Sequence, residues 1–132
     1  MNENSDKIKV LMNEIEKGER KLMEENALIA KKFFVNTFEK KGFEDVSFQE
    51  WEEDKEENKI GELMERTGEL KNSIKIDNLE NNSVEVVSTA PYAGFVNDGT
   101  RRMPARPFMK DSKVLETKIL NNVVGFLDKT FK

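Results

Sequence analysis

Residues 91–108 read Pro-Tyr-Ala-Gly-Phe-Val-Asn-Asp-Gly-Thr-Arg-Arg-Met-Pro-Ala-Arg-Pro-Phe, and the rest of the chain is organised around this stretch. Pro91 favours an extended residue before it and so ends a preceding strand. Asp98-Gly99 predicts a turn in which the glycine can adopt a positive φ. Pro104 and Pro107 fix φ and remove two backbone donors, which indicates a stiff extended strap rather than a flexible loop.

Two roles are open for the strap, residues 101–108. In the first, it crosses the domain and inserts Phe108 into the core. In the second, its cations contact a partner, and its stiffness lowers the entropy cost of that contact. The cations of the strap and its end are Arg101, Arg102, Arg106 and Lys110.

The composition limits the remaining possibilities. With 132 residues, the chain predicts a single domain over residues 1–132. The absence of Cys and His removes disulfides, thiolate nucleophiles and the commonest general base and metal ligand. We therefore expect no enzyme, no catalytic residues, no cofactor and no metal site. The polar, acidic N-terminus lacks a signal-peptide pattern, and no apolar run reaches membrane-spanning length, which predicts a cytoplasmic protein without a membrane partner.

Charge is segregated along the chain. Residues 39–66 carry eleven Asp/Glu and five Lys/Arg, a balance of −6, whereas residues 101–132 carry eight Lys/Arg and three Asp/Glu, a balance of +5. This pattern favours contact between identical neighbours, acidic face to basic face, at least as well as nucleic-acid binding.

A long amphipathic helix is predicted for the N-terminal region, residues 1–41. Gly18 lies where the apolar stripe needs a large residue, so the helix either kinks or breaks there or tolerates the glycine. Lys40-Lys41-Gly42 predicts its end, with Gly42 as the glycine that follows the last turn. The apolar positions recur at three- and four-residue spacing and include Ile8, Leu11, Met12, Ile15, Leu22, Met23, Ala27, Ala30, Phe33, Phe34 and Phe38.

The next region, residues 42–59, is predicted to be a long acidic loop. Its carboxylates lack the spacing and central glycine of a calcium loop, which indicates a solvated face. Trp51 is either a core plug beneath the loop or an interface anchor beside Glu52 and Glu53.

An antiparallel hairpin and a last helix follow. Ile74 and Ile76 precede a polar turn, and the β-branched run of residues 83–89 then predicts the second strand of a small antiparallel sheet within residues 60–110. Asp111 or Ser112 can cap a C-terminal helix over residues 111–132, with a stripe of Leu115, Ile119, Val123, Phe126 and Leu127. The expected fold is α+β, with this helix packed on the sheet.

Four ordered motifs carry a family resemblance. They are residues 66–74, Arg-Thr-Gly-Glu-Leu-Lys-Asn-Ser-Ile; Tyr92-Ala93; residues 97–100, Asn-Asp-Gly-Thr; and residues 103–108, Met-Pro-Ala-Arg-Pro-Phe. In this order the motifs resemble tailed-phage virion morphogenesis proteins, the tail-completion or head–tail joining family that includes the G protein of phage Mu. The sequence departs from many relatives by having no His after Tyr92-Ala93 and only one glycine at residues 99–100.

The resemblance implies a non-enzymatic protein that forms a homo-oligomeric ring. A hexamer is one stoichiometry that the family resemblance suggests. The implied partners are other head–tail joint or tail-tube proteins, with DNA only passing through the channel. The implied locations are the host bacterial cytoplasm during assembly and the head–tail junction of the virion. By resemblance, the strap locks the C-terminal helix against the sheet, with Phe108 in the core and Arg106 paired to a carboxylate or to backbone carbonyls.

The candidate residues fall into two groups. The strap and core group contains Tyr92, Gly99, Pro104, Arg106, Pro107 and Phe108. The group expected to contact a partner or a second subunit contains Arg101, Arg102, Trp51, Glu52 and Glu53.

Two other functions are compatible with the residues. A small nucleic-acid-binding module would use the basic strap from Arg101 to Lys110, although the chain is net acidic and lacks a recognisable stacking platform. A hydrolase would need a carboxylate pair using residues such as Glu85 or Asp98, and no spacing here places a convincing pair.

Overall fold

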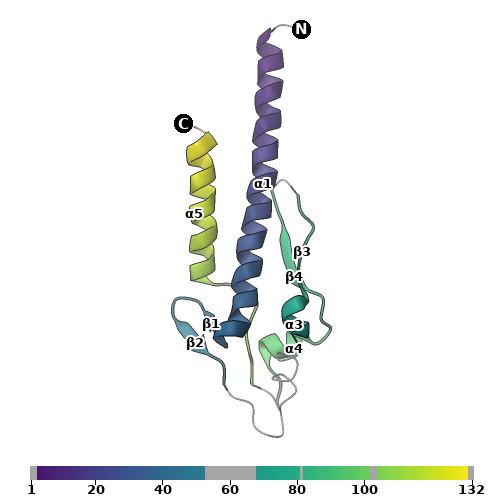
Figure 1. The fold of residues 1–132 in the computed structure, drawn as a ribbon, viewed down its shortest axis with the longest axis vertical. Coiled ribbons are helices and arrows are strands. Elements are labelled where there is room, and N and C mark those ends of the chain that lie inside the picture. The colour runs from purple at the N-terminus through teal and green to yellow at the C-terminus, as the bar shows by residue number, and fades with distance from the viewer. Residues whose placement is uncertain (1–2, 53–67, 81, 102–103, 131–132) are drawn as a thin grey trace.

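A computed structural model of the protein describes residues 3–52, 68–80, 82–101 and 104–130 (Figure 1). Two long helices and two short hairpins confirm the predicted α+β class. The helices are α1 (Glu3–Lys40), α3 (Glu69–Asn72), α4 (Ala93–Asp98) and α5 (Lys113–Thr130). The strands are β1 (Gly42–Glu44), β2 (Phe48–Glu50), β3 (Ile74–Asp77) and β4 (Glu85–Ser88).

Helix α1 continues through Gly18, so the break considered there does not occur. The glycine has a packing role instead. A Cβ at this position would approach Cε2 of Phe126 to 2.8 Å, inside normal contact distance. Gly18 therefore leaves room for the Phe126 ring of α5, which offsets its poor helix propensity.

The end of α1 differs from the prediction by one residue. Lys41, with φ 53°, takes the left-handed conformation that the sequence assigned to Gly42. Gly42 instead starts β1, where a Cβ would meet the Phe48 ring and lie 2.6 Å from the carbonyl oxygen of Gln49. Close approach within a hairpin, rather than a helix cap, is the reason for the glycine here.

Residues 42–50 are an antiparallel hairpin, which corrects the predicted acidic loop over its first half. Strand β1 pairs with β2 in the register Gly42↔Glu50 and Glu44↔Phe48. The backbone N–H of Trp51 then donates to the backbone carbonyl of Lys41 at 2.9 Å, and this hydrogen bond closes the hairpin against the end of α1. Burial of Phe43, only 2% exposed, anchors the first strand in the core.

The second hairpin lies where the sequence predicted it. Strand β3 pairs antiparallel with β4, from Ile74↔Ser88 to Asp77↔Glu85. At its base the Thr89 N–H donates to the Ser73 carbonyl at 3.0 Å, and the Ser73 and Ser88 hydroxyls share a 2.6 Å hydrogen bond. Leu70 lies in α3 and is fully buried, which corrects the reading of its apolar side chain as part of the first strand together with Ile74 and Ile76.

Helix α5 lies antiparallel along α1, and α1 is its most extensive neighbour (Figure 1). Asn122 donates to the side-chain oxygen of Asn26 across the two helices at 2.9 Å. The expected C-terminal helix is present, but it packs chiefly on α1 because that helix offers a far longer apolar face than four-residue strands can.

The core lies where α1, both hairpins and α4 meet, at the end of the molecule away from the N-terminus (Figure 1). It contains Phe33 and Phe34 from the end of α1 together with residues from β1, α3, β3, α4, the strap and α5. The buried members are Ala30, Phe33, Phe34, Phe43, Trp51, Leu70, Ile74, Val96, Phe108 and Leu115.

Candidate functional site

The strap passes between α4 and the β1–β2 hairpin, and α4 is its first attachment. The Arg106 N–H donates to the carbonyl of Val96 at 2.8 Å. Helix α4 ends at Asp98, and the φ of 80° at the following residue, Gly99, permits the reversal that returns the chain along the helix. The turn predicted at Asp98-Gly99 therefore sets the direction of the strap.

A second attachment comes from Asn97, a residue that the sequence analysis assigned to the turn. Its side-chain oxygen accepts hydrogen bonds from the Phe108 N–H at 2.9 Å and from the Met109 N–H at 3.1 Å. One side chain thus satisfies two successive backbone donors where the strap has no strand neighbour. An Asn directly before Asp-Gly is ordinary turn chemistry, so its sequence context gives no signal for this bridging role.

On the opposite side, the strap is attached to the residues that follow β2. The indole N–H of Trp51 donates to the Pro107 carbonyl at 3.0 Å, and the Arg106 guanidinium donates to the Glu52 carbonyl at 3.3 Å. Arg106 is only 5% exposed, and a buried guanidinium needs such acceptors. The Glu52 backbone carbonyl is one acceptor of Arg106, and backbone carbonyls are one of the two kinds of partner that the resemblance implies.

Phe108 supplies the apolar part of this arrangement. It is 1% exposed, and its ring centroid lies 5.3 Å from that of Phe38, which in turn lies 5.7 Å from Trp51 in an edge-on contact. The strap is therefore held by polar contacts on both sides and by one buried ring, as a brace between the end of α1 and α4.

The residues after the strap connect α5 to the same hairpin. The Ser112 hydroxyl donates to the Glu44 carbonyl at 2.6 Å and accepts from the Leu115 N–H at 3.2 Å, which makes it the N-cap of α5. The Lys113 N–H also donates to the Asp45 carboxylate at 2.7 Å. Of the two predicted caps, Ser112 is the one used, and the start of α5 is fixed to the β1–β2 hairpin.

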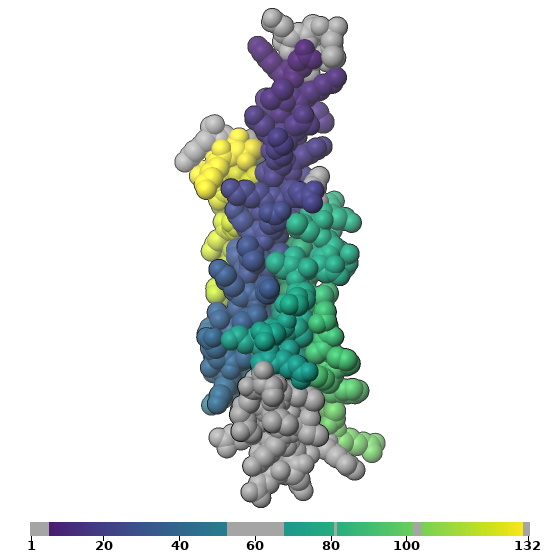
Figure 2. Space-filling view, turned by 45° about the vertical axis from the view of Figure 1, so that its right-hand side comes forward, coloured from purple at the N-terminus to yellow at the C-terminus, as the bar shows by residue number. Residues whose placement is uncertain are grey.

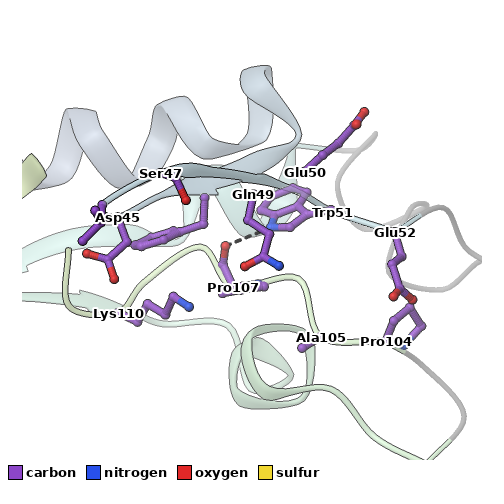
Figure 3. A pocket seen from close by; sticks show the side chains of 12 residues that line it. Asp45, Ser47, Gln49, Glu50, Trp51, Glu52, Pro104, Ala105, Pro107 and Lys110 are labelled. Atoms are coloured by element: carbon purple, nitrogen blue, oxygen red, sulfur yellow. Dashed lines mark hydrogen bonds between the residues drawn. The ribbon is translucent and has the colours of Figure 1, made fainter. Parts of the chain in front are cut away.

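A groove of about 430 Å³ opens between this hairpin and the strap (Figure 3). Trp51 and Pro107 form its floor, where the dashed hydrogen bond of Figure 3 joins them. Carboxylates of the hairpin line one wall, while the Lys110 ammonium lies 5.2 Å above the Phe43 ring. The lining residues are Phe43, Asp45, Val46, Ser47, Gln49, Glu50, Trp51, Glu52, Pro104, Ala105, Pro107 and Lys110.

The groove offers little chemistry among the residues that the structure describes. No group of three or more Asp or Glu side chains in those ranges is arranged to hold a metal ion. The carboxylates proposed for hydrolysis, Glu85 and Asp98, lie apart on β4 and α4 and do not line the groove. The arrangement holds a strap in place, and it presents polar and acidic side chains along one edge.

The two groups of candidate residues occupy different environments. Phe108 and Arg106 are buried, while Pro104 and Pro107 are half-buried in the groove wall. Trp51 is 8% exposed and lies in the core beneath the hairpin, as the core plug does, and its contact with a partner stays a prediction. Arg101 and Glu52 are exposed, whereas Arg102 and Glu53 lie outside the described residues.

Tyr92 lies at the start of α4, half-buried, near α3. Its hydroxyl is buried and makes no well-aligned hydrogen bond within the described part of the chain. Burial, and after it the neighbouring Glu69 carboxylate, raises the pKa of Tyr92 above its usual 10.0. The side chain of Tyr92 also packs against the hydrophobic core.

The structure weakens the basic strap as a nucleic-acid surface. Of its four cations, Arg106 is buried and Lys110 lies over the Phe43 ring. Arg101 is exposed, and Arg102 lies outside the described ranges. Lys110 is exposed as well, and two described cations facing solvent, Arg101 and Lys110, are a small footprint for phosphate neutralisation.

These observations define a class: a small α+β protein with a long N-terminal helix and a braced, proline-rich strap. Residues 4–99 match the family described as "Bacteriophage HK97-gp10, putative tail-component". The chain belongs to this HK97 gp10-like family, which gives it a structural role in a bacteriophage and a location in the virion. The match bears out a phage-tail-related family and names neither the Mu G protein nor head–tail joining.

The matched range contains α1, both hairpins and α4, and it ends at Gly99, before the strap. No curated protein and no solved structure matches the chain. Among the helices that the structure describes, none combines the length and apolarity needed to cross a membrane.

Proposed function

We propose that the protein is a non-enzymatic, ring-forming subunit that acts in tail completion or head–tail joining of a phage or prophage virion. The observation that carries this proposal is the match of residues 4–99 to a family of phage tail components. Its partners are identical subunits and neighbouring virion proteins of the joint or tail tube, with DNA passing through the ring. Assembly takes place in the host bacterial cytoplasm.

The braced strap supports an architectural role. Five described hydrogen bonds and a buried ring hold residues 106–109 between α4 and the hairpin, which favours a fixed surface over a mobile active-site loop. A fixed surface lowers the entropy cost of assembly. Exposed Arg101 begins the strap, and exposed Glu50 and Glu52 lie on the hairpin side. Opposite charges on one subunit suit a heterologous contact, which closes into a ring when the rotation per subunit allows it.

The direct test is a prophage or phage that lacks the gene. We expect particles whose tails are incomplete or not joined to heads, as seen by electron microscopy, and restoration by the wild-type gene. Native mass spectrometry of the purified full chain should show a closed oligomer. Intact, infectious particles from the deletion, together with a strict monomer at high concentration, would overturn the proposal.

A charge-reversal variant tests the acidic-to-basic contact. Arg101→Glu combined with Arg102→Glu should leave the thermal unfolding temperature unchanged and reduce both oligomer formation and complementation. Lys21→Glu combined with Lys32→Glu is the matched control, because both lysines are exposed on α1 and the net charge changes equally. Equal effects from the two pairs would show that overall charge, and not the start of the strap, governs assembly.

A further inference from the structure

Helix α1 extends well beyond the end of its partner helix. Phe126 of α5 packs at Gly18, and α5 ends at Thr130, while α1 begins at Glu3 (Figures 1 and 2). We define the overhang as residues 3–15. At 1.5 Å of rise per residue, it projects on the order of 20 Å from the rest of the molecule.

The overhang carries an apolar stripe that faces solvent. Ile8 is 59% exposed, Leu11 57% and Met12 56%, and Ile15 is half-buried at the base of the stripe. At 100° per residue, these side chains lie in line with Gly18 and Leu22. The stripe is therefore the continuation of the face on which α5 packs, without α5 to cover it.

The overhang lacks the packing from which most helical stability in proteins comes. It continues the unbroken helix α1, so it needs no nucleation of its own, but its apolar side chains remain in water. A second surface that covers Ile8, Leu11 and Met12 would therefore stabilise it.

A matching surface is present on α5 of the same chain. Leu120 is 59% exposed, Val124 55% and Leu127 47%, at spacings of four and three residues. Their stripe flanks the inner face formed by Leu115, Ile119 and Phe126. Leu127, which the sequence assigned to the inner face, belongs to this outer stripe.

The two stripes fit each other in length and charge. Ile8 to Ile15 and Leu120 to Leu127 each cover eight residues, whose ends are seven steps or about 10 Å apart along the helix. The overhang carries two Lys and three Asp/Glu, a balance of −1, and α5 carries three Lys and two Asp/Glu, a balance of +1. No net repulsion opposes their contact, and one contact would cover both exposed stripes.

We infer that the overhang of one copy packs against the outer stripe of α5 on a second copy of the same chain. The contact is heterologous, because it joins two different surfaces, and its repetition adds subunits in one direction. It supplies the main apolar interface for the ring proposed above and rests on that proposal. A second copy is favoured over an unrelated partner because both complementary surfaces belong to this chain and lie at the same end of it.

Disulfide trapping tests this contact directly, because the chain contains no Cys. Leu11→Cys and Val124→Cys are made singly and together in the full chain, and the purified proteins are oxidised mildly. We expect little cross-linking from either single variant, a mixed dimer from an equal mixture of the two, and a ladder of higher oligomers from the double variant. Intact mass spectrometry identifies the mixed dimer, and non-reducing electrophoresis shows the ladder.

Val10→Cys is the matched control. Val10 is 58% exposed on the same helix but lies off the stripe, so Val10→Cys with Val124→Cys should cross-link at least tenfold less than the test pair. Equal cross-linking of the control pair, dimers from Leu11→Cys alone, or no mixed dimer would each overturn the inference. A wild-type oligomer by native mass spectrometry without mixed dimers would exclude this interface only, whereas normal particles from the deletion would exclude the proposed function.

Discussion

The two ends of the molecule are stabilised in different ways. At the braced end, which comprises both hairpins, α4 and the strap, aromatic rings are buried and backbone groups are satisfied by specific side chains such as Asn97 and Trp51. At the overhang, large apolar side chains such as Ile8 and Leu11 remain in solvent. The difference indicates that the braced end folds within one chain, while the overhang completes its packing only with a second chain.

The largest effect should come from removing the ring that the strap inserts at the braced end. Phe108→Ala should lower the free energy of unfolding by about 3–5 kcal/mol, because a fully buried ring is lost and a cavity remains. Denaturant unfolding followed by Trp51 fluorescence measures the change. Phe95→Ala is the control, since that ring is 62% exposed, and it should stay within about 0.5 kcal/mol of wild type. Similar losses from both variants would mean that the strap is not part of the core.

The next largest effect concerns the polar attachment of the strap. Asn97→Ala leaves the Phe108 and Met109 N–H groups without their acceptor and should cost about 1–3 kcal/mol. Asn97→Asp keeps an acceptor oxygen and should retain most of the stability. Thermal unfolding by circular dichroism ranks the two variants. An Asp variant as unstable as the Ala variant would show that loss of the bridging oxygen does not cause the loss of stability.

The sequence predicted the elements whose residue types recur in a regular pattern. Three- and four-residue apolar spacing marked both long helices, and β-branched residues marked β4. The β1–β2 hairpin was missed because its strands have three residues each and β2 is exposed throughout, so neither alternation nor length distinguishes it from a loop. The acidic run that follows reinforced that error.

The site was predictable to a similar degree. The prolines indicated a stiff strap and Phe108 a buried ring, since both follow from local chemistry. The roles of Asn97 and Trp51 depend on residues 11 and 56 positions away, and only the folded chain brings those groups together. The exposed side of α5 was also missed, because a broad apolar face does not reveal from sequence which sector meets α1.

At the overhang, a polar substitution should affect assembly far more than folding. Leu11→Lys removes an exposed apolar side chain and should change the free energy of unfolding of the isolated chain by no more than about 0.5 kcal/mol. It should still shift the oligomer towards monomer in sedimentation velocity. Val10→Lys, at the same exposure but off the stripe, should leave the oligomer unchanged. A large loss of unfolding free energy from Leu11→Lys in the monomer would contradict the comparison, because Leu11 would then stabilise the fold within one chain, as the residues of the braced end do.

The smallest effect concerns pH at the braced end. Because the folded-state pKa of Tyr92 is raised, the unfolded chain loses this proton first as pH rises. The contribution of protonated Tyr92 to the free energy of unfolding is fully present below pH 10.0, the ordinary pKa of tyrosine, and it is lost as the pH rises through the pKa of Tyr92 in the folded state. Stability of the wild type should therefore fall above pH 10.0 by slightly more than that of Tyr92→Phe, which cannot ionise.

This titration can be followed directly, since Tyr92 is the single tyrosine of the chain and tyrosinate absorbs in the near ultraviolet. Glu69→Gln separates the two causes of the raised Tyr92 pKa, because it removes the neighbouring negative charge and leaves the Tyr92 side chain buried to the same extent. The pKa of Tyr92 should then move down but stay above 10.0, as burial is the larger cause. An unperturbed midpoint in the folded wild type would mean that α4 leaves the Tyr92 hydroxyl open to water, and the braced end would be looser than its other contacts indicate.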